Sequence, residues 1–158
     1  MTTWQKARPL AIAMLFGGAL MGALSAHAVV NPPIRMVHGI EYMSGGIGSD
    51  EAALMETVAP RWAATLEFTV KDGKAADFAS DVRVTVRDSG GNAVLDQVTS
   101  NGPFFLARLD PGRYEVEATL GSQTLKQPLT VMTGAAAKAM FVWPAGTDMA
   151  SRSTRAPS

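Results

Sequence analysis

The sequence predicts an all-β protein: a seven-stranded antiparallel β-sandwich preceded by a signal peptide, an extended arm and one short helix. Apolar and polar residues alternate with a period of two over residues 82–87 and 114–120, as they do in half-buried strands. Short segments rich in Gly, Asn, Asp and Ser separate these runs, at the intervals typical of β-sandwiches. The run 109–114 contains Pro111 and Gly112, which predict a type II turn with a positive φ at Gly112. Because such turns splay the strands they join, this one predicts a corner between two sheets.

The first 28 residues have the pattern of a secretory signal peptide. Lys6 and Arg8 precede an apolar run over residues 10–24, and small residues end at Ala28. The alternative is a membrane anchor, but a spanning helix needs about 20 apolar residues and this run is shorter. We therefore predict cleavage after Ala28, a mature chain without a membrane span, and a periplasmic or secreted location.

Composition limits the size and the partners of the mature chain. Removing residues 1–28 leaves 130 of the 158 residues, which suits one domain with its own core. Lys6 and Arg8 are lost, so 12 of the 14 basic residues remain beside 14 acidic ones. A net charge near −2 disfavours nucleic acid as a partner. The absence of cysteine favours a bacterial envelope over the disulfide-rich class of secreted domains.

Residues 29–61 are predicted to form the extended arm and the short helix. Pro and Gly are frequent in the first part, which favours an extended chain. Ser49 is a good N-cap, and Asp50 and Glu51 fall in the first turn, where carboxylates interact well with the helix dipole. An apolar stripe at helical spacing follows, and Pro60 ends the helix.

The sandwich domain is predicted over residues 62–143, and a disordered tail over 144–158. Residues 121–122 are predicted to form a hairpin turn, and Pro128, which lacks an N–H, to mark an edge strand or a bulge. Tyr114 follows the corner on the core-facing register, and we expect it to lock the turn as a tyrosine corner does. The seven predicted strands cover residues 62–70, 82–87, 93–98, 104–109, 114–120, 124–131 and 138–143.

Three short motifs follow one another along this domain. They are Val84-x-Val86-x-Asp88-x-x-Gly91, Gly102-x-Phe104 and Leu109-x-Pro111-Gly112-x-Tyr114-x-Val116. In this order and spacing they resemble the carboxypeptidase regulatory-like domains, a transthyretin-like (prealbumin-like) β-sandwich also grouped with carbohydrate-binding-like folds. The resemblance covers about residues 62–143, and the stretch 42–51 is similar to the leader of small bacterial exported proteins that carry this domain. It implies a fold and brings no catalytic residue.

The residue inventory does not support an enzyme. His38 is the single histidine after residue 28, cysteine is absent, and no Gly-x-Ser-x-Gly motif occurs. Hydroxyisourate hydrolases share the transthyretin-like fold, but they rely on several histidines and a Tyr-Arg-Gly-Ser ending, whereas this chain ends Arg-Ala-Pro-Ser. We therefore predict a protein without catalytic residues and without a cofactor.

Three segments have residues that could bind a ligand, but a structural explanation is favoured for each. Residues 45–48 could bind phosphate before the helix, but Asp50 and Glu51 already supply negative charge and the Walker lysine is absent. Met36 and His38 could hold Cu(I), although two ligands are few and methionine is a common core filler. Aspartates 72, 77, 81 and 88 could bind Ca²⁺, but their spacing matches no EF-hand, and aspartate is common in turns.

The predicted function is binding or structural, with protein–protein interaction in the bacterial envelope as the leading hypothesis. The alternative is a carbohydrate-binding module, in which Trp62 or Trp143 would stack on a sugar; their alternation with polar neighbours favours burial instead. The partner is therefore an unknown envelope protein or glycan. The predicted interaction surface consists of His38, Tyr42, Met43, Asp50 and Glu51.

Overall fold

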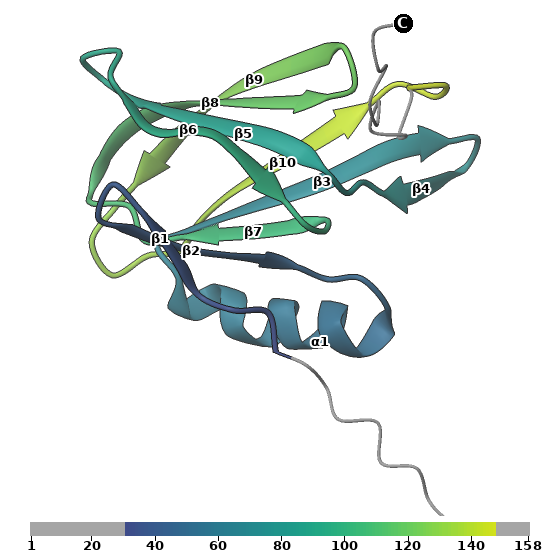
Figure 1. The fold of residues 1–158 in the computed structure, drawn as a ribbon, viewed down its shortest axis with the longest axis horizontal. Helices are drawn as coiled ribbons and strands as arrows, with labels where there is room; N and C mark the ends of the chain where they lie inside the picture. The colour runs from purple at the N-terminus through teal and green to yellow at the C-terminus, as the bar shows by residue number, and fades with distance from the viewer. Residues whose placement is uncertain (1–30, 148–158) are drawn as a thin grey trace, which may run out of the picture.

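The computed structural model describes residues 31–147, which form two packed β-sheets and one α-helix (Figure 1). This confirms an all-β sandwich. The predicted signal peptide lies outside the described residues, as does the predicted tail beyond Thr147. In chain order the elements are β1 (Arg35–Val37), β2 (Ile40–Gly45), α1 (Ser49–Val58), the 3₁₀ turn η1 (Ala59–Arg61), β3 (Ala64–Asp72), β4 (Ala75–Phe78), β5 (Val82–Asp88), β6 (Ala93–Ser100), β7 (Phe104–Ala107), β8 (Gly112–Leu120), β9 (Gln123–Val131) and β10 (Ala137–Trp143).

The strands divide into a six-stranded sheet A and a four-stranded sheet B. Sheet A has the order β1-β2-β7-β3-β10, with β4 also paired to β3, and sheet B has the order β6-β5-β8-β9. Two features correct the predicted seven-stranded antiparallel arrangement: the described residues form ten strands, and β10 pairs with β3 in parallel. The parallel pair needs no helical crossover, because the chain leaves β3, builds the rest of the sandwich and returns from β9 to the far edge of sheet A.

The segment predicted as an extended arm contributes β1 and β2 to sheet A. β2 pairs with β7 from Tyr42↔Ala107 to Gly45↔Phe104. Its residues 42–45 are buried whether they face the sandwich or the helix, so the alternation that reveals a half-buried strand is missing. The predicted helix is confirmed, but Ser49 is its first residue and not its N-cap, which is Gly48 and carries no side-chain cap.

β4 is a second strand that the sequence did not indicate. It forms a hairpin with β3, with pairs from Thr69↔Phe78 to Asp72↔Ala75, and it projects from one end of the sandwich (Figure 1). All four of its residues are exposed, so no apolar face marks it in the sequence. Along β3, β4 continues the line of β7, which pairs with the preceding residues Ala64 to Glu67.

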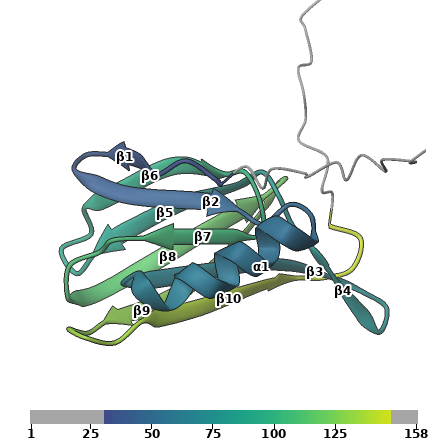
Figure 2. The same cartoon turned by 90° about the horizontal axis from the view of Figure 1, so that it is seen from below.

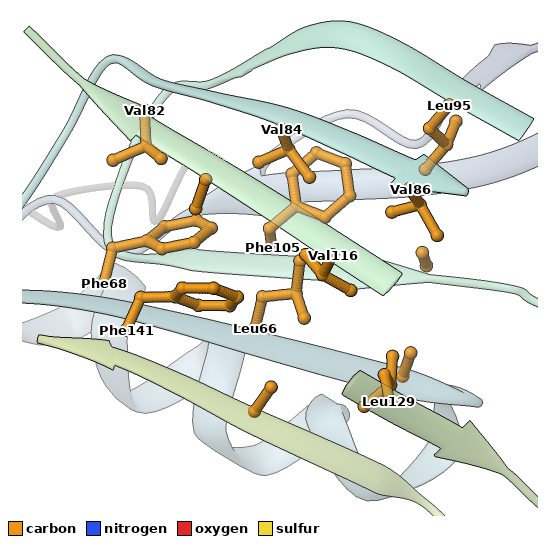
Figure 3. Packing of buried hydrophobic residues seen from close by; sticks show 14 of the residues in the cluster. Leu66, Phe68, Val82, Val84, Val86, Leu95, Phe105, Val116, Leu129 and Phe141 are labelled. Atoms are coloured by element: carbon orange, nitrogen blue, oxygen red, sulfur yellow. The ribbon is translucent and has the colours of Figure 1, made fainter. Parts of the chain in front are cut away.

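The main core fills the space between the sheets, where side chains from both interdigitate (Figure 3). Sheet B contributes Val84 and Val86, and sheet A contributes Phe68, Phe105 and Phe141, all of them essentially inaccessible to solvent. The aromatic rings of Phe68 and Phe141 lie 5.8 Å apart in a tilted arrangement. The period-two runs of the sequence thus correspond to strands with one face in this core.

The helix α1 lies across the outer face of sheet A (Figure 2). A second, smaller core is formed beneath it. Met55 of the helix packs there on Met43 of β2 and on Phe104 and Leu106 of β7. Trp62 belongs to this second cluster, although the alternation placed it on the same face as Leu66. It precedes β3, directly after η1, so the register of the strand does not extend to it.

The corner between β7 and β8 joins sheet A to sheet B, as predicted. The predicted type II turn is wrong, because Gly112 does not have a positive φ. It is the first residue of β8 and pairs with Val131, which requires an extended backbone. Tyr114 confirms the tyrosine corner: its hydroxyl donates to the carbonyl oxygen of Asp110 at 2.7 Å, and its half-buried ring packs against the core.

The edge strands β9 and β10 face each other along one side of the sandwich. Gln127 Nε2 donates to the carbonyl oxygen of Met140 at 2.6 Å, and Trp143 Nε1 donates to that of Gln123 at 3.2 Å. Pro128 lies in β9, which pairs only with β8, so the predicted edge strand is confirmed. Side-chain donors thus link the two sheets where no ladder joins them.

Candidate functional site

The five residues of the predicted interaction surface do not lie on one surface. His38 is exposed in the turn between β1 and β2, with φ 49°. Tyr42 is buried in the main core, where its ring stacks on Phe105 at 5.2 Å, and Met43 is buried beneath α1. They face opposite sides of sheet A because they are consecutive in one strand.

The remaining two predicted residues lie at the start of α1, where they serve different purposes. Asp50 is exposed. Glu51 turns back on the preceding loop: its Oε1 accepts hydrogen bonds from the N–H groups of Gly46 at 2.7 Å and Ile47 at 3.4 Å. The amides that could have bound phosphate are thus satisfied by a carboxylate of the same chain, which agrees with the structural interpretation of residues 45–48.

Metal-binding geometry is absent from the described residues. Over 31–147, no group of three or more His, Asp or Glu side chains is placed to hold an ion. The Asp88 carboxylate instead accepts hydrogen bonds from its own loop, from the backbone N–H groups of Gly90 and Asn92, both at 2.9 Å. The bond from Asn92 lowers the pKa of Asp88, as expected for a carboxylate that caps a turn.

Ion pairs cover the outer face of sheet B. Glu117 lies between Lys126 Nζ at 2.9 Å and Arg87 Nε at 3.5 Å, and Lys126 also approaches Glu115 at 3.8 Å. The hydrogen bond from Lys126, followed by the charges of both cations, lowers the pKa of Glu117. The cationic partners are largely exposed to solvent, so these pairs contribute little to stability, and this is a solvated face.

The outer face of sheet A is different, because apolar side chains remain exposed where α1 does not cover it. Phe78 of β4, Thr69 of β3 and Val142 of β10 form one cross-strand row. Glu67 and Met140 lie opposite each other in the neighbouring row. The side chains of Phe78, Met140 and Val142 are 58%, 47% and 38% exposed. We refer to these three residues as the outer patch.

A groove continues the outer patch toward α1. Its volume is about 320 Å³, and it lies between the end of the helix and strands β3 and β10. Glu67 and Lys138 form an ion pair of 2.6 Å on its floor. The groove is lined by Glu56, Ala59, Pro60, Thr65, Glu67, Phe104, Ala136, Ala137 and Lys138.

A second groove, of about 350 Å³, lies at the end of the sandwich near the β7–β8 corner. Trp62 is in its wall but is only 5% exposed, and the Arg108 guanidinium lies over the ring at 4.6 Å. Arg108 also pairs with Glu41 at 2.7 Å. Trp143 is fully buried, so the expected burial of both tryptophans is confirmed and neither offers a face for a sugar.

The outer patch was missed in the sequence, although one signal was present. In the predicted strand 138–143, Met140 and Val142 occupy positions that alternate with buried Phe141 and Trp143, where polar residues are expected on a solvated face. Phe78 gave no signal, because its strand was not predicted.

Comparison of the chain with protein-family models and with curated protein sequences finds no match. In addition, none of the helices formed by residues 31–147 combines the length and the apolar character that a membrane crossing requires.

Proposed function

We propose that this chain is an exported, non-catalytic module that binds another protein of the bacterial envelope through the outer patch and the adjoining groove. The observation that carries the proposal is the exposure of Phe78, Met140 and Val142 on neighbouring strands of one sheet face. Apolar side chains that gather on a surface, with polar residues around them, are typical of protein-binding sites.

The surroundings of the patch favour a polypeptide as ligand. The groove presents apolar side chains together with two carboxylates, Glu56 and Glu67, and one ammonium group, Lys138. Such a lining suits a short segment with alternating apolar and polar residues. Among residues 31–147, Phe78 is the aromatic side chain that is more than half exposed, and one ring is a small platform for a glycan. The carbohydrate-binding alternative therefore has less support from this surface.

The finer fold assignment is part of the same proposal. We propose that residues 62–143 form a carboxypeptidase regulatory-like, transthyretin-like domain, to which β1, β2 and α1 are added. The two-sheet architecture, the corner from β7 to β8 and the Tyr114 hydrogen bond support it. In such a domain the contribution of this chain is binding, and the chemistry belongs to its partners.

Site-specific photocrosslinking tests the proposed surface. A benzophenone amino acid at position 140, in the outer patch, is expected to give a discrete adduct with a second protein in cells that produce the chain. The same probe at Met132, which is 62% exposed in the loop between β9 and β10, is the matched control and is expected to give none. Absence of an adduct at position 140, or equal adducts at both positions, would contradict the proposal.

A further inference from the structure

Most free strand edges of the sandwich are closed to further pairing. β9 contains Pro128, which donates no hydrogen bond, and β10 has its edge carbonyl at Met140 bonded to Gln127. In β6 the positive φ of Gln97, 51°, coincides with a shift of register, and its N–H donates to Thr85 Oγ1 at 3.1 Å. β1 is three residues long and follows two prolines. Such features prevent edge-to-edge association.

The edge of β4 lacks these protections. The Ala79 N–H donates to the Phe68 carbonyl oxygen at 3.0 Å, which fixes the phase of the β3–β4 ladder. Because bonding directions alternate along a strand, Asp77 and Ala75 also face β3, whereas the N–H and C=O groups of Ala76 and Phe78 face outward. Proline, a bulge and a covering side chain are all absent from this edge within the described chain.

The place beside this edge is a vacant strand position in sheet A. β4 continues the line of β7, and β7 pairs on its other side with β2. β2 ends at Gly45, and the chain turns away at Gly46, whose φ is 102°. No strand of the described residues therefore lies next to the outward-facing groups of β4 (Figure 1).

We propose that this position is filled by β4 of a second copy of the chain, so that two sheets A join in an antiparallel, twofold-symmetric pair. The twofold axis passes midway between the two copies of Ala76, which lie opposite each other. In this register Lys74 of one copy lies opposite Phe78 of the other, and Ala75 lies opposite Asp77. The first pair is favourable, because an ammonium group is attracted to an aromatic ring, and the second places a small neutral residue opposite a carboxylate.

The neighbouring symmetric registers are less suitable. Shifting the axis to Asp77 places two carboxylates opposite each other, which is destabilising. Shifting it to Ala75 leaves Phe78 opposite the hairpin bend near Asp72 and shortens the pairing. The register centred on Ala76 uses the whole of β4. It places both outer patches, each with its Phe78, on the same face of the joined sheet. The charges and the length of this edge thus favour self-pairing in the register centred on Ala76.

Sedimentation velocity of the purified protein over a concentration series tests the pairing. The unaltered chain is expected to form a dimer whose fraction grows with concentration, because an interface of a few residues is weak. Ala76→Asp and Ala76→Lys should each abolish the dimer, since each places like charges on the twofold axis. A mixture of the two variants should restore it as a heterodimer. Ala135→Asp, at an exposed alanine at the other end of the sandwich, is the matched control and should dimerise normally.

Each result decides the proposal. A monomeric unaltered protein overturns it and leaves the β4 edge to an extended segment of another protein. A dimer that survives Ala76→Asp, or charge variants that do not recover when mixed, also overturns it, because the dimer would then use another surface. Thermal melting curves of both variants show whether they fold. The inference goes beyond the proposed function and does not depend on it, since purified protein contains no envelope partner.

Discussion

At the scale of single residues, Tyr114 shows how one side chain holds the passage between the two sheets. Its hydroxyl bonds the carbonyl oxygen of Asp110, four residues earlier, and its ring lies against the core. The hydrogen bond closes the corner, and the ring anchors the start of β8. Both contacts are made by Tyr114 itself, and its hydrogen-bond partner is only four residues away, so the corner depends on a short stretch of sequence.

Two substitutions separate these contacts. Tyr114→Phe removes the hydrogen bond and should lower the free energy of unfolding by about 0.5–1.5 kcal/mol. Tyr114→Ala also removes the half-buried ring and should cost about 2–3 kcal/mol, somewhat less than a fully buried aromatic residue. Urea denaturation measures both. Equal losses for the two variants would show that the ring contributes nothing.

The same residue should make stability depend on alkaline pH. Burial, followed by the nearby carboxylates of Asp110 and Asp88, raises the pKa of Tyr114 above its ordinary value of 10.0. A raised folded-state pKa means that the stabilisation is fully present below pH 10 and is lost as the pH rises through the folded-state value. Lys126, whose pKa the bond to Glu117 raises, titrates in the same range in both the unaltered protein and Tyr114→Phe. The difference between their stability curves should therefore shrink above pH 10, and a constant difference would refute this account.

Gly102 and Gly112 differ in the space around them and not in the sign of φ. A Cβ added at Gly102 would collide with the backbone of Gly45 at the end of β2, whereas one at Gly112 would lie 3.7 Å from the Tyr114 ring, an ordinary contact. Gly102→Ala should therefore cost about 2 kcal/mol or more, as overpacking does. Gly112→Ala should change stability by less than about 0.5 kcal/mol. Thermal unfolding of the pair checks this, and a large loss at Gly112 would restore the turn with positive φ that the sequence suggested.

At the scale of elements, α1 is held on sheet A by its apolar side and by its first turn. Glu51 accepts from two loop amides, and no side chain caps the helix at Gly48. The Glu51 carboxylate is therefore the principal acceptor for the amides that precede the helix.

Substitution of Glu51 tests this role. Glu51→Ala leaves the Gly46 N–H without its acceptor and should reduce stability by about 1 kcal/mol, the usual cost of a lost helix cap. Asp50→Ala is the matched control, because Asp50 is exposed and accepts a long hydrogen bond, 3.4 Å, from Ser49 Oγ; it should cost less. Amide hydrogen exchange in α1 should accelerate for Glu51→Ala alone, and equal acceleration in both variants would count against the role.

The sequence predicted the strands that have one buried apolar face and one exposed polar face. It did not predict the strands in which both faces are buried or both are exposed. Val84 and Val86 in β5 alternate with arginines and a threonine, so the strand was visible. β2 was not, because Tyr42 meets one core and Met43 the other. β4 has no buried residue. The alternation of residues in β10 also does not predict its direction, since a strand with one apolar face can pair in parallel or antiparallel.

The candidate site was harder to predict than the fold, because it depends on how much of sheet A is covered by α1. Whether Met140 is buried or exposed depends on how far the helix reaches across sheet A. The helix covers β2 and β7, so Met43 is buried, whereas Met140 on β10 is not. The predicted surface residues lie within one stretch of sequence, 38–51, whereas the outer patch joins residues more than sixty positions apart.

At the scale of the whole molecule, the proposed export of the protein can be tested directly. If residues 1–28 are a signal peptide, the protein recovered from the envelope fraction of a producing bacterium should begin at Val29. Intact-mass spectrometry distinguishes this from the full chain of 158 residues. Ala28→Arg should block cleavage and cause the precursor to accumulate, and a mature protein that still begins at Met1 would contradict the prediction.

The parallel pairing of β10 with β3 also bears on the order of events during folding. Ala137 pairs with Ala64 and Trp143 with Val70, so the closing ladder joins segments more than seventy residues apart. Such non-local contacts raise the relative contact order and slow folding. Sheet A is completed only when residue 143 is available, which means that a partly synthesised or partly translocated chain remains unclosed. If the chain is exported as proposed, sheet A therefore cannot be completed until its last strand has left the secretion channel.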